Sequence, residues 1–117
     1  MTLLPDAASA DVAPAKVAGY LLNTAHPRNG GKAAFFAAFG FDITQWDVLR
    51  DALRQHPLAN DVVSSQRSPH GNKHVVRCSM MSPDGRNPCI TTIWITDGDG
   101  PPRFVTAYPS PSQPGEI

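Results

Sequence analysis

The chain has 117 residues, of which 41% are apolar and 17% charged, and its formal net charge is zero. This length is typical of a single domain with one modest core. The neutral balance excludes a strong overall attraction to nucleic acid or membranes, so any nucleic-acid site must be local. The sequence contains no membrane-spanning stretch and no secretory signal, and we therefore expect a cytoplasmic protein.

The two ends of the chain differ from its middle. Residues 1–15 are rich in Ala, Asp and Pro and show no hydrophobic period, and residues 111–117 are polar and contain Pro. Both segments are predicted to be flexible tails. The structured part is then a single domain that covers residues 16–110.

Helices are predicted in the first half of this domain. Residues 16–23 (KVAGYLLN) form a short apolar segment, which we interpret as a helix, the alternative being an extended segment. A second helix is expected over residues 29–39 and should end at Gly40, because glycine suits the left-handed position after a helix. A third, amphipathic helix is expected to begin with Thr44 as its N-cap and to end at Pro57.

The hydrophobic period changes from about 3.6 to 2 after residue 61. Four segments with alternating apolar residues are separated by the turn sequences PHGN, PDGR and DGDGPP. This pattern predicts four strands joined as an antiparallel meander. Helices followed by strands define an α+β fold, in which two or three N-terminal helices pack on one face of the sheet.

Strict alternation sorts the strand residues into two faces. The set predicted to lie under the helices is aliphatic and comprises Val76, Cys78, Met80, Ile93, Ile95, Val105 and Ala107. The opposite face would carry Arg77, Ser79, Thr92, Trp94, Thr96, Phe104, Thr106 and Tyr108. Surfaces that stack bases and bind phosphates have this composition, so Arg77, Thr92, Trp94 and Phe104 are candidate substrate-binding residues. The alternative is an ordinary outer face of β-forming side chains.

The stretch HPRNGGKAAFF, residues 26–36, carries the best candidates for chemistry. His26 has a side chain that titrates near neutrality and suits proton transfer. Lys32 stands at a predicted helix start, where free N–H groups favour an anion such as phosphate. The alternative is a loop histidine followed by a solvated lysine.

The remaining histidines and the cysteines suggest no metal site. His70 and His74 would need a third ligand, and no motif of a known nucleophile or phosphate loop is present. Cys78 and Cys89 are interpreted as half-buried strand residues, the alternative being a disulfide between neighbouring strands. We expect neither a metal ion nor another cofactor.

Two blocks carry a resemblance to a known family. The first, YLLNTAHPRNGGKAAFFAAFGF, fits the pattern YLLN-x-x-HP-x-x-x-x-KA-x-FF, and the second, RFVTAYPS, fits R-x-VTAYP. With WDVLRDAL and TTIWIT they resemble, over residues 16–110, a bacterial family without assigned function, found alone and at the C-terminal ends of large secreted toxins. The layout is also similar to small toxin ribonucleases, which include barnase, EndoU-like domains, colicin nucleases and RelE and which work without a metal.

The resemblance implies a function and a catalytic set. The set is His26, Lys32, Arg103, Thr106 and Tyr108. The histidine would act as acid or base on a ribose 2′-hydroxyl, the two cations would bind phosphate, and threonine and tyrosine would position it. The implied substrate is RNA, including tRNA, and the implied partner is a cognate immunity or antitoxin protein. In a secreted toxin the domain would be delivered into a target-cell cytoplasm.

Two alternatives remain open beside a ribonuclease. One is a non-catalytic immunity- or adaptor-like module that binds a protein through Trp94, Phe104 and Tyr108. The other is a small homodimer that pairs through the same sheet face without catalysis.

Overall fold

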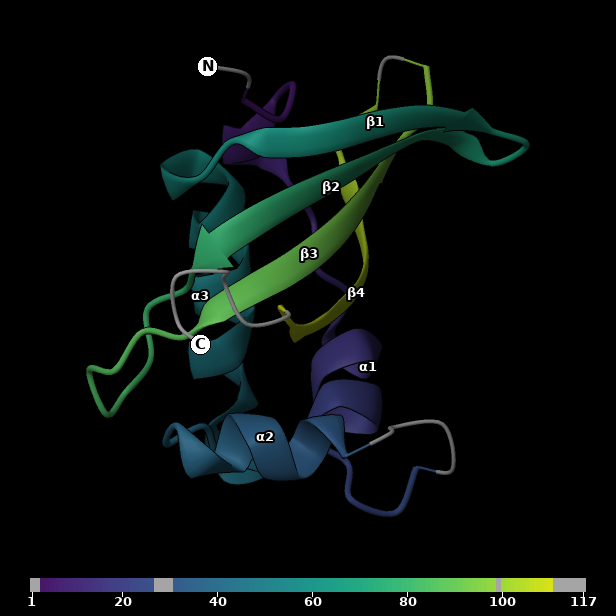
Figure 1. Cartoon of the computed structure of the whole chain (residues 1–117). Coiled ribbons are helices and arrows are strands. Elements are labelled where there is room, and N and C mark those ends of the chain that lie inside the picture. Colours follow the sequence, from purple (N-terminus) through teal and green to yellow (C-terminus); the bar gives the residue numbers. More distant parts are fainter. Residues whose placement is uncertain (1–2, 27–30, 99, 111–117) are drawn as a thin grey trace.

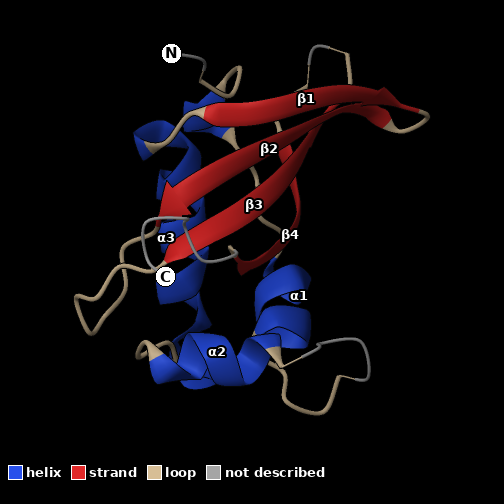
Figure 2. Ribbon diagram, in the orientation of Figure 1, coloured by secondary structure: helices blue, strands red, loops and turns tan. Residues whose placement is uncertain are grey.

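The computed structural model describes residues 3–26, 31–98 and 100–110. Its helical half contains six short elements: η1 (Ala7–Ser9), α1 (Pro14–Lys16), η2 (Val17–Leu21), α2 (Lys32–Ala38), η3 (Ile43–Gln45) and α3 (Trp46–Ala59). The strands follow as β1 (Val62–Ser68), β2 (Gly71–Ser79), β3 (Cys89–Thr96) and β4 (Arg103–Pro109). They form one antiparallel sheet in the order β1-β2-β3-β4. The predicted α+β meander is confirmed, and Figures 1 and 2 show α3 behind the strands.

Local sequence explains the ends of α2. Gly40 has φ 99°, and its N–H donates to the carbonyl of Ala37 at 3.0 Å. The N–H of Phe41 donates to the carbonyl of Phe36 at 3.2 Å. These two bonds form a Schellman ending, which satisfies carbonyls that the helix leaves unpaired. The expected stop at Gly40 is confirmed.

The ends of α3 differ from the expected ones. Asp42, rather than Thr44, provides the capping side chain: its Oδ1 accepts from the N–H of Thr44 at 2.9 Å and caps η3 ahead of the helix. Pro57 lies inside the last turn instead of ending the helix. The helix continues to Ala59, and the side chain of Asn60 donates to the carbonyl of His56 at 3.0 Å. This side chain satisfies a carbonyl near the helix end, where no further turn supplies N–H donors.

The N-terminal segment packs into the domain instead of forming the expected tail. Leu4, Ala10 and Val12 are each 2% exposed. The N–H of Asp11 donates to the carbonyl of Pro102 at 2.8 Å, and the carbonyl of Asp11 accepts from Phe104 at 2.9 Å. The segment therefore covers the outer edge of β4, whose backbone groups would otherwise be unpaired. The other predicted tail, residues 111–117, lies outside the described residues.

Substitutions of two neighbouring leucines test whether the N-terminal segment belongs to the folded domain. Leu4→Ala is expected to lower the free energy of unfolding by about 2–4 kcal/mol, because it opens a cavity in the core. Leu3 is 51% exposed, so Leu3→Ala is the matched control and should change stability by about 0.5 kcal/mol or less. Urea unfolding followed by tryptophan fluorescence measures both. Equal, negligible effects would mean that the segment is a tail after all.

The two faces of β3 are the reverse of those expected. Ile90, Thr92 and Trp94 are fully buried toward the helices, while Ile93 and Ile95 lie on the opposite face. Trp94 buries more apolar surface than an isoleucine would, and so the pleat turns the indole toward the core. Its polar N–H is also satisfied there.

A bulge changes the faces of β4. Ile93 pairs with Thr106 while Trp94 pairs with Phe104, so Val105 is an extra residue in β4. Phe104 and Ala107 consequently both face the core, although they are three residues apart.

The predicted substrate-binding set is divided by this arrangement. Thr92, Trp94 and Phe104 are core residues, and placing them on an open face was wrong. Arg77 pairs with Thr91 in the sheet, so its side chain lies on the face opposite α3. The alternation rule failed because it contains no information about bulges or about which of two apolar faces is the larger.

A buried histidine joins the sheet to α3. His56 is 1% exposed, its Nε2 lies 2.7 Å from the carbonyl of Cys78, and its Nδ1 lies 2.9 Å from Oγ1 of Thr92. A carbonyl can only accept a hydrogen bond, so Nε2 of His56 carries the proton. The imidazole is neutral, and its Nδ1 accepts a hydrogen bond from the hydroxyl of Thr92. Trp94 Nε1 donates to the same threonine at 2.8 Å. Burial lowers the pKa of His56, against a smaller opposing effect of the Cys78 carbonyl.

This histidine makes stability depend on pH. The pKa of His56 in the folded state lies below its unfolded value of about 6.5, so its contribution is complete above that pH. Stability is lost as pH falls from about 6.5 toward the folded-state pKa, because only the unfolded chain takes up the proton. We expect the urea concentration at the unfolding midpoint to decrease when the pH is lowered from about 7.5 to about 5.5. The fall should be smaller in His56→Gln, and an identical fall in both proteins would contradict this role.

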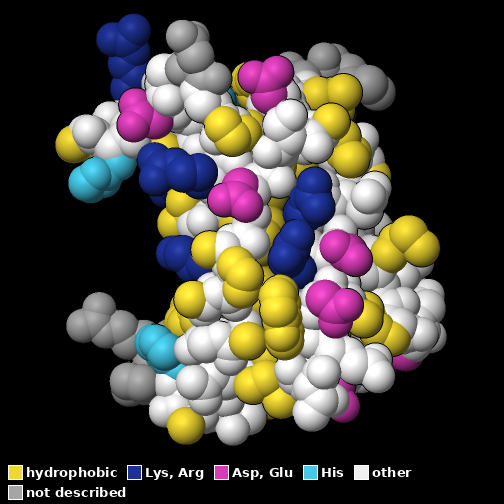
Figure 3. Space-filling model, turned by 180° about the vertical axis from the view of Figure 1, so that it is seen from behind, with side chains coloured by type: hydrophobic (Ala, Val, Ile, Leu, Met, Phe, Trp, Pro, Cys, Tyr) yellow, Lys and Arg dark blue, Asp and Glu magenta, His cyan; other side chains and the backbone are white. Residues whose placement is uncertain are grey.

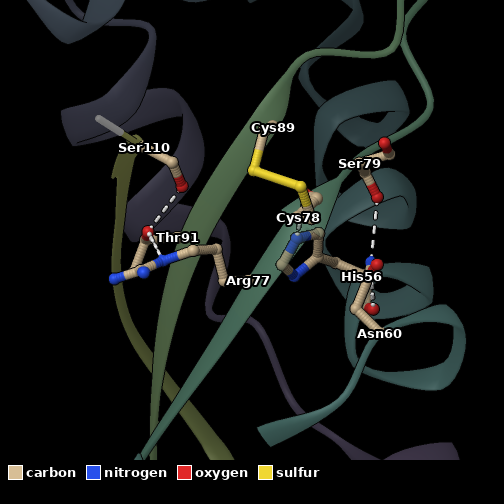
Figure 4. Close-up of a disulfide and its surroundings, with 8 residues drawn as sticks. All are labelled: His56, Asn60, Arg77, Cys78, Ser79, Cys89, Thr91 and Ser110. Atoms are coloured by element: carbon tan, nitrogen blue, oxygen red, sulfur yellow. Dashed lines mark hydrogen bonds between the residues drawn. A yellow bond between two sulfur atoms is a disulfide. The ribbon is translucent and has the colours of Figure 1, made fainter. Parts of the chain in front are cut away.

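The disulfide that the sequence left open is present. Cys78 at the end of β2 is joined to Cys89 at the start of β3, beside His56 (Figure 4). The connecting loop is attached to the end of α2 by Arg86, which pairs with Asp84 at 2.6 Å and lies 4.3 Å from the ring centre of Phe39. The disulfide and the contacts of Arg86 thus hold the end of α2 against the loop between β2 and β3.

Candidate functional site

The side chain of Lys32 connects α2 to β4. Lys32 is the first residue of α2, and its Nζ donates to Oγ1 of Thr106 at 2.9 Å and to Oη of Tyr20 at 2.8 Å. The ammonium lies 4.9 Å from the ring centre of Tyr20 and 5.9 Å from that of Tyr108. Two aromatic rings and two hydroxyls thus surround one partly buried cation. We call Lys32, Tyr20, Thr106 and Tyr108 the lysine cluster.

The lysine cluster changes the acidity of a phenol. The pKa of Tyr20 is lowered, mainly by the hydrogen bond from Lys32, and burial opposes this by raising it. The charge of Lys32, the Thr106 hydroxyl and the more distant charge of Lys16 lower it further. A hydroxyl in this environment is a better proton donor than an ordinary tyrosine.

His26 lies beside the lysine cluster. Its ring meets the ring of Tyr20 edge-on, with the centres 4.9 Å apart and the planes at 78°. Asn23 shapes the turn that brings it there: its Oδ1 accepts from the N–H of Ala25 at 3.0 Å, and its Nδ2 donates to the carbonyl of Gly19 at 3.2 Å. The backbone N–H of His26 donates to the carbonyl of Asn23 at 3.2 Å. Residues 27–30, the remainder of the HPRNGG loop, lie outside the described residues.

The five predicted catalytic residues fall into two groups. Lys32 and Thr106 are hydrogen-bonded, Tyr108 lies against the ammonium, and His26 is linked to them through Tyr20. Arg103 stands before the bulge at Val105 and pairs with Ile95, whereas Thr106 pairs with Ile93, so the two lie about 7 Å apart along β4 at roughly 3.3 Å per paired residue. It lines a pocket with Thr106 and Tyr108, whereas the hydrogen bonds of Lys32 among the described residues go to Tyr20 and Thr106.

Arg77, the other predicted cation, has a separate environment. Its Nε donates to Oγ1 of Thr91 at 3.4 Å, and that hydroxyl is 2.7 Å from Oγ of Ser110 (Figure 4). Among the described residues, the hydrogen bonds of Lys32 go to Tyr20 and Thr106 and to no member of this group. Arg77 is therefore on the predicted side of the sheet but outside the lysine cluster.

Two residues of the site were missed by sequence reasoning. Tyr20 opens the YLLN block six residues before His26, so the motif itself contained the signal. Lys16 reaches β4 from the end of α1, and its Nζ donates to the carbonyl of Val105 at 3.1 Å. Val105 is the extra residue of the bulge, and nothing in the sequence announced where that bulge lies.

The arrangement can bind an anion and move protons. A cation, an acidified phenol and an imidazole, all from residues 20–32, come together beside the hydroxyl of Thr106, which is 74 residues from Lys32. Figure 3 shows Lys and Arg side chains gathered along the hollowed side of the surface seen from behind, with histidines above and below the hollow. These are the groups needed for proton transfer and charge stabilisation at a phosphate.

The fold and site define a small α+β domain with a lysine-centred cluster of polar and aromatic side chains against its last strand. The chain belongs to the DUF6883 family, a domain of unknown function, whose profile matches residues 3–111. This match includes the N-terminal segment that packs against β4. No curated protein matches the chain. None of the helices in the described ranges is long and apolar enough to cross a membrane.

A solved structure shares the fold. It is a chain of a contact-dependent growth inhibition toxin–immunity protein complex from Klebsiella pneumoniae 342. The TM-score is 0.68 with 22% sequence identity, over 87% of this chain and 99% of that chain. At this identity the likeness concerns the fold, and it spans almost the whole of both chains.

Proposed function

We propose that this domain is a toxin-type endoribonuclease that cleaves RNA by acid–base catalysis at the lysine cluster. The observation that carries the proposal is the position of Lys32 Nζ between Tyr20 Oη and Thr106 Oγ1, with the His26 ring against Tyr20. Such a cluster provides a fixed cation for a phosphate and two groups suited to proton transfer. The fold shared with a chain of a toxin–immunity complex supports the toxin context.

The chemistry assigns one role to each group. His26 accepts the proton of a ribose 2′-hydroxyl, whose oxygen then bonds to phosphorus. Lys32 stabilises the charge that develops on the phosphoryl oxygens, held in place by Thr106. The bond to the 5′-oxygen breaks, and Tyr20 donates a proton to that leaving oxygen. The products are a 2′,3′-cyclic phosphate and a free 5′-hydroxyl, and the reaction uses side chains alone.

A direct assay tests the proposal. The purified domain is incubated with total tRNA and with ribosomal RNA in the presence of EDTA, and the ends of the fragments are mapped. We expect discrete cleavage with cyclic-phosphate and 5′-hydroxyl ends, together with growth arrest when the domain is expressed in bacteria. Intact RNA and unaffected growth would refute the proposal, and loss of cleavage in EDTA would refute the metal-free chemistry.

A second candidate is a non-catalytic protein of the immunity type. The matched chain comes from a complex that contains both a toxin and its immunity protein, so the shared fold also supports a partner-binding role. This candidate predicts harmless expression, protection of cells against a toxin encoded nearby, and a stable complex in size-exclusion chromatography. Growth arrest by the isolated domain excludes it.

A further inference from the structure

A pocket of about 970 Å³ adjoins the lysine cluster on the sheet face opposite α3. One wall is formed by the N-terminal segment between Asp11 and Lys16, and the other by the β1–β2 turn at 68–70. Thr106 and Tyr108 belong both to the pocket lining and to the lysine cluster. A ligand in the pocket is therefore continuous with a group bound at Lys32.

The rim of this pocket is cationic. Lys16, Lys73 and Arg103 line it, and none of them forms an ion pair within the described part of the chain. Two carboxylates, Asp11 and Asp97, also line it, so cations outnumber anions before Lys32 is added. A chain of zero net charge thus concentrates positive charge at one place, which attracts a polyanion locally.

The floor of the pocket is apolar and aromatic. Ile93 and Ile95 come from β3, and Tyr108 adds a partly exposed ring beside Lys32. Cations at the rim and an apolar, aromatic floor match the needs of a single strand of nucleic acid, whose phosphates pair with cations while its bases stack. A folded acidic protein would need only the rim.

The dimensions fit more than one nucleotide. Because Val105 is a bulge residue, Arg103 and Thr106 pair with Ile95 and Ile93 and lie about 7 Å apart along β4, at roughly 3.3 Å per paired residue. This equals about two stacked nucleotides at roughly 3.4 Å each. We infer that the pocket binds unpaired RNA next to the cleavage position, with Lys73 and Arg103 pairing with phosphates beyond the one held by Lys32. The inference rests on the proposed function and adds a substrate class to it: an unpaired stretch rather than a single phosphodiester.

Binding is tested without cleavage. The ligand is a fluorescent RNA of about eight nucleotides, 2′-O-methylated throughout so that no 2′-hydroxyl can attack. Anisotropy gives Kd for the wild type, Lys73→Ala, Arg103→Ala and the control Arg67→Ala. Arg67 is exposed on the same hairpin as Lys73, but its side chain points to the other face and does not line the pocket. We expect each pocket variant to weaken binding about tenfold at about 0.1 M salt and to reduce the salt slope by about one, whereas the control matches the wild type.

The outcomes separate this inference from the proposed function. Cleavage of a dinucleotide needs only the lysine cluster, so it tests the proposed function without the pocket. A wild type that binds the oligonucleotide but cleaves nothing contradicts the proposed function and leaves the pocket assignment standing. The assignment is overturned if the wild type does not bind the oligonucleotide, if the pocket variants bind it like the wild type, or if Arg67→Ala is equally weakened. It is also overturned if the pocket variants lose affinity for an immunity protein while their affinity for the oligonucleotide stays unchanged.

Discussion

RNA cleavage is expected to fall about 10²- to 10³-fold when Lys32 is replaced by alanine, because the change removes the one cation fixed at the reacting phosphate. The side chain is oriented by hydrogen bonds to Tyr20 and Thr106, so an ammonium from solution does not replace it. Lys32→Met is the sharper variant, since it keeps most of the apolar length of the side chain and removes the ammonium with its charge and its N–H donors. Single-turnover cleavage of a defined RNA measures both.

Two companion variants define what this result means. His26→Ala should lower cleavage by about 10²- to 10⁴-fold by removing the acid–base group. Arg67→Ala, a charge removed from an exposed position in β1, should cleave like the wild type. Circular dichroism and urea midpoints check that each variant is folded. Full activity in a folded Lys32→Met protein would remove the lysine cluster from the mechanism.

Trp94→Ala is expected to cost about 3–5 kcal/mol of unfolding free energy, the largest effect of a single substitution that we predict. The indole is fully buried, packs edge-on against Phe104 with ring centres 5.4 Å apart, and donates to Thr92. Its removal leaves a cavity between the sheet and α3 and takes one donor from the network around His56. The change should be measured by urea unfolding followed by circular dichroism.

The neighbouring residue of the same strand provides the control. Ile95 faces the opposite side and is half-buried, so Ile95→Ala should cost only about 1–2 kcal/mol. Where Trp94→Ala leaves too little folded protein to measure, Trp94→Phe keeps most of the apolar volume and should cost less. A larger loss for Ile95→Ala than for Trp94→Ala would restore the face assignment that simple alternation predicts.

Both predictions concern residues whose surroundings come from distant parts of the chain. Lys32 binds a threonine 74 residues later, and Trp94 shares a threonine with a histidine of α3. The buried core and the candidate site are thereby separated in space. The face of the sheet toward α3 forms the core, and the opposite face carries the lysine cluster and the pocket.

Local signals in the sequence were sufficient for the element order. Turn sequences, the change of hydrophobic period and Gly40 act over a few residues, and they predicted the helices, the four strands and the meander. The HP…KA block also pointed to His26 and Lys32, because their residue types suit acid–base and phosphate chemistry, and the resemblance of the VTAYP block to a known family added Thr106 and Tyr108.

Tertiary structure alone decided how these parts are used. Each face of β3 carries apolar side chains and could face the core, and only the packing of Trp94 against α3 selects one of the two faces. The bulge at Val105 shifts Phe104 into the core, and it presents the carbonyl that Lys16 binds. The N-terminal residues lack any period, yet they are ordered because β4 offers them an unpaired edge. The sequence therefore determined which groups are available, while long-range packing determined that Lys32 meets Thr106 of β4, since a contact across 74 residues leaves no local pattern.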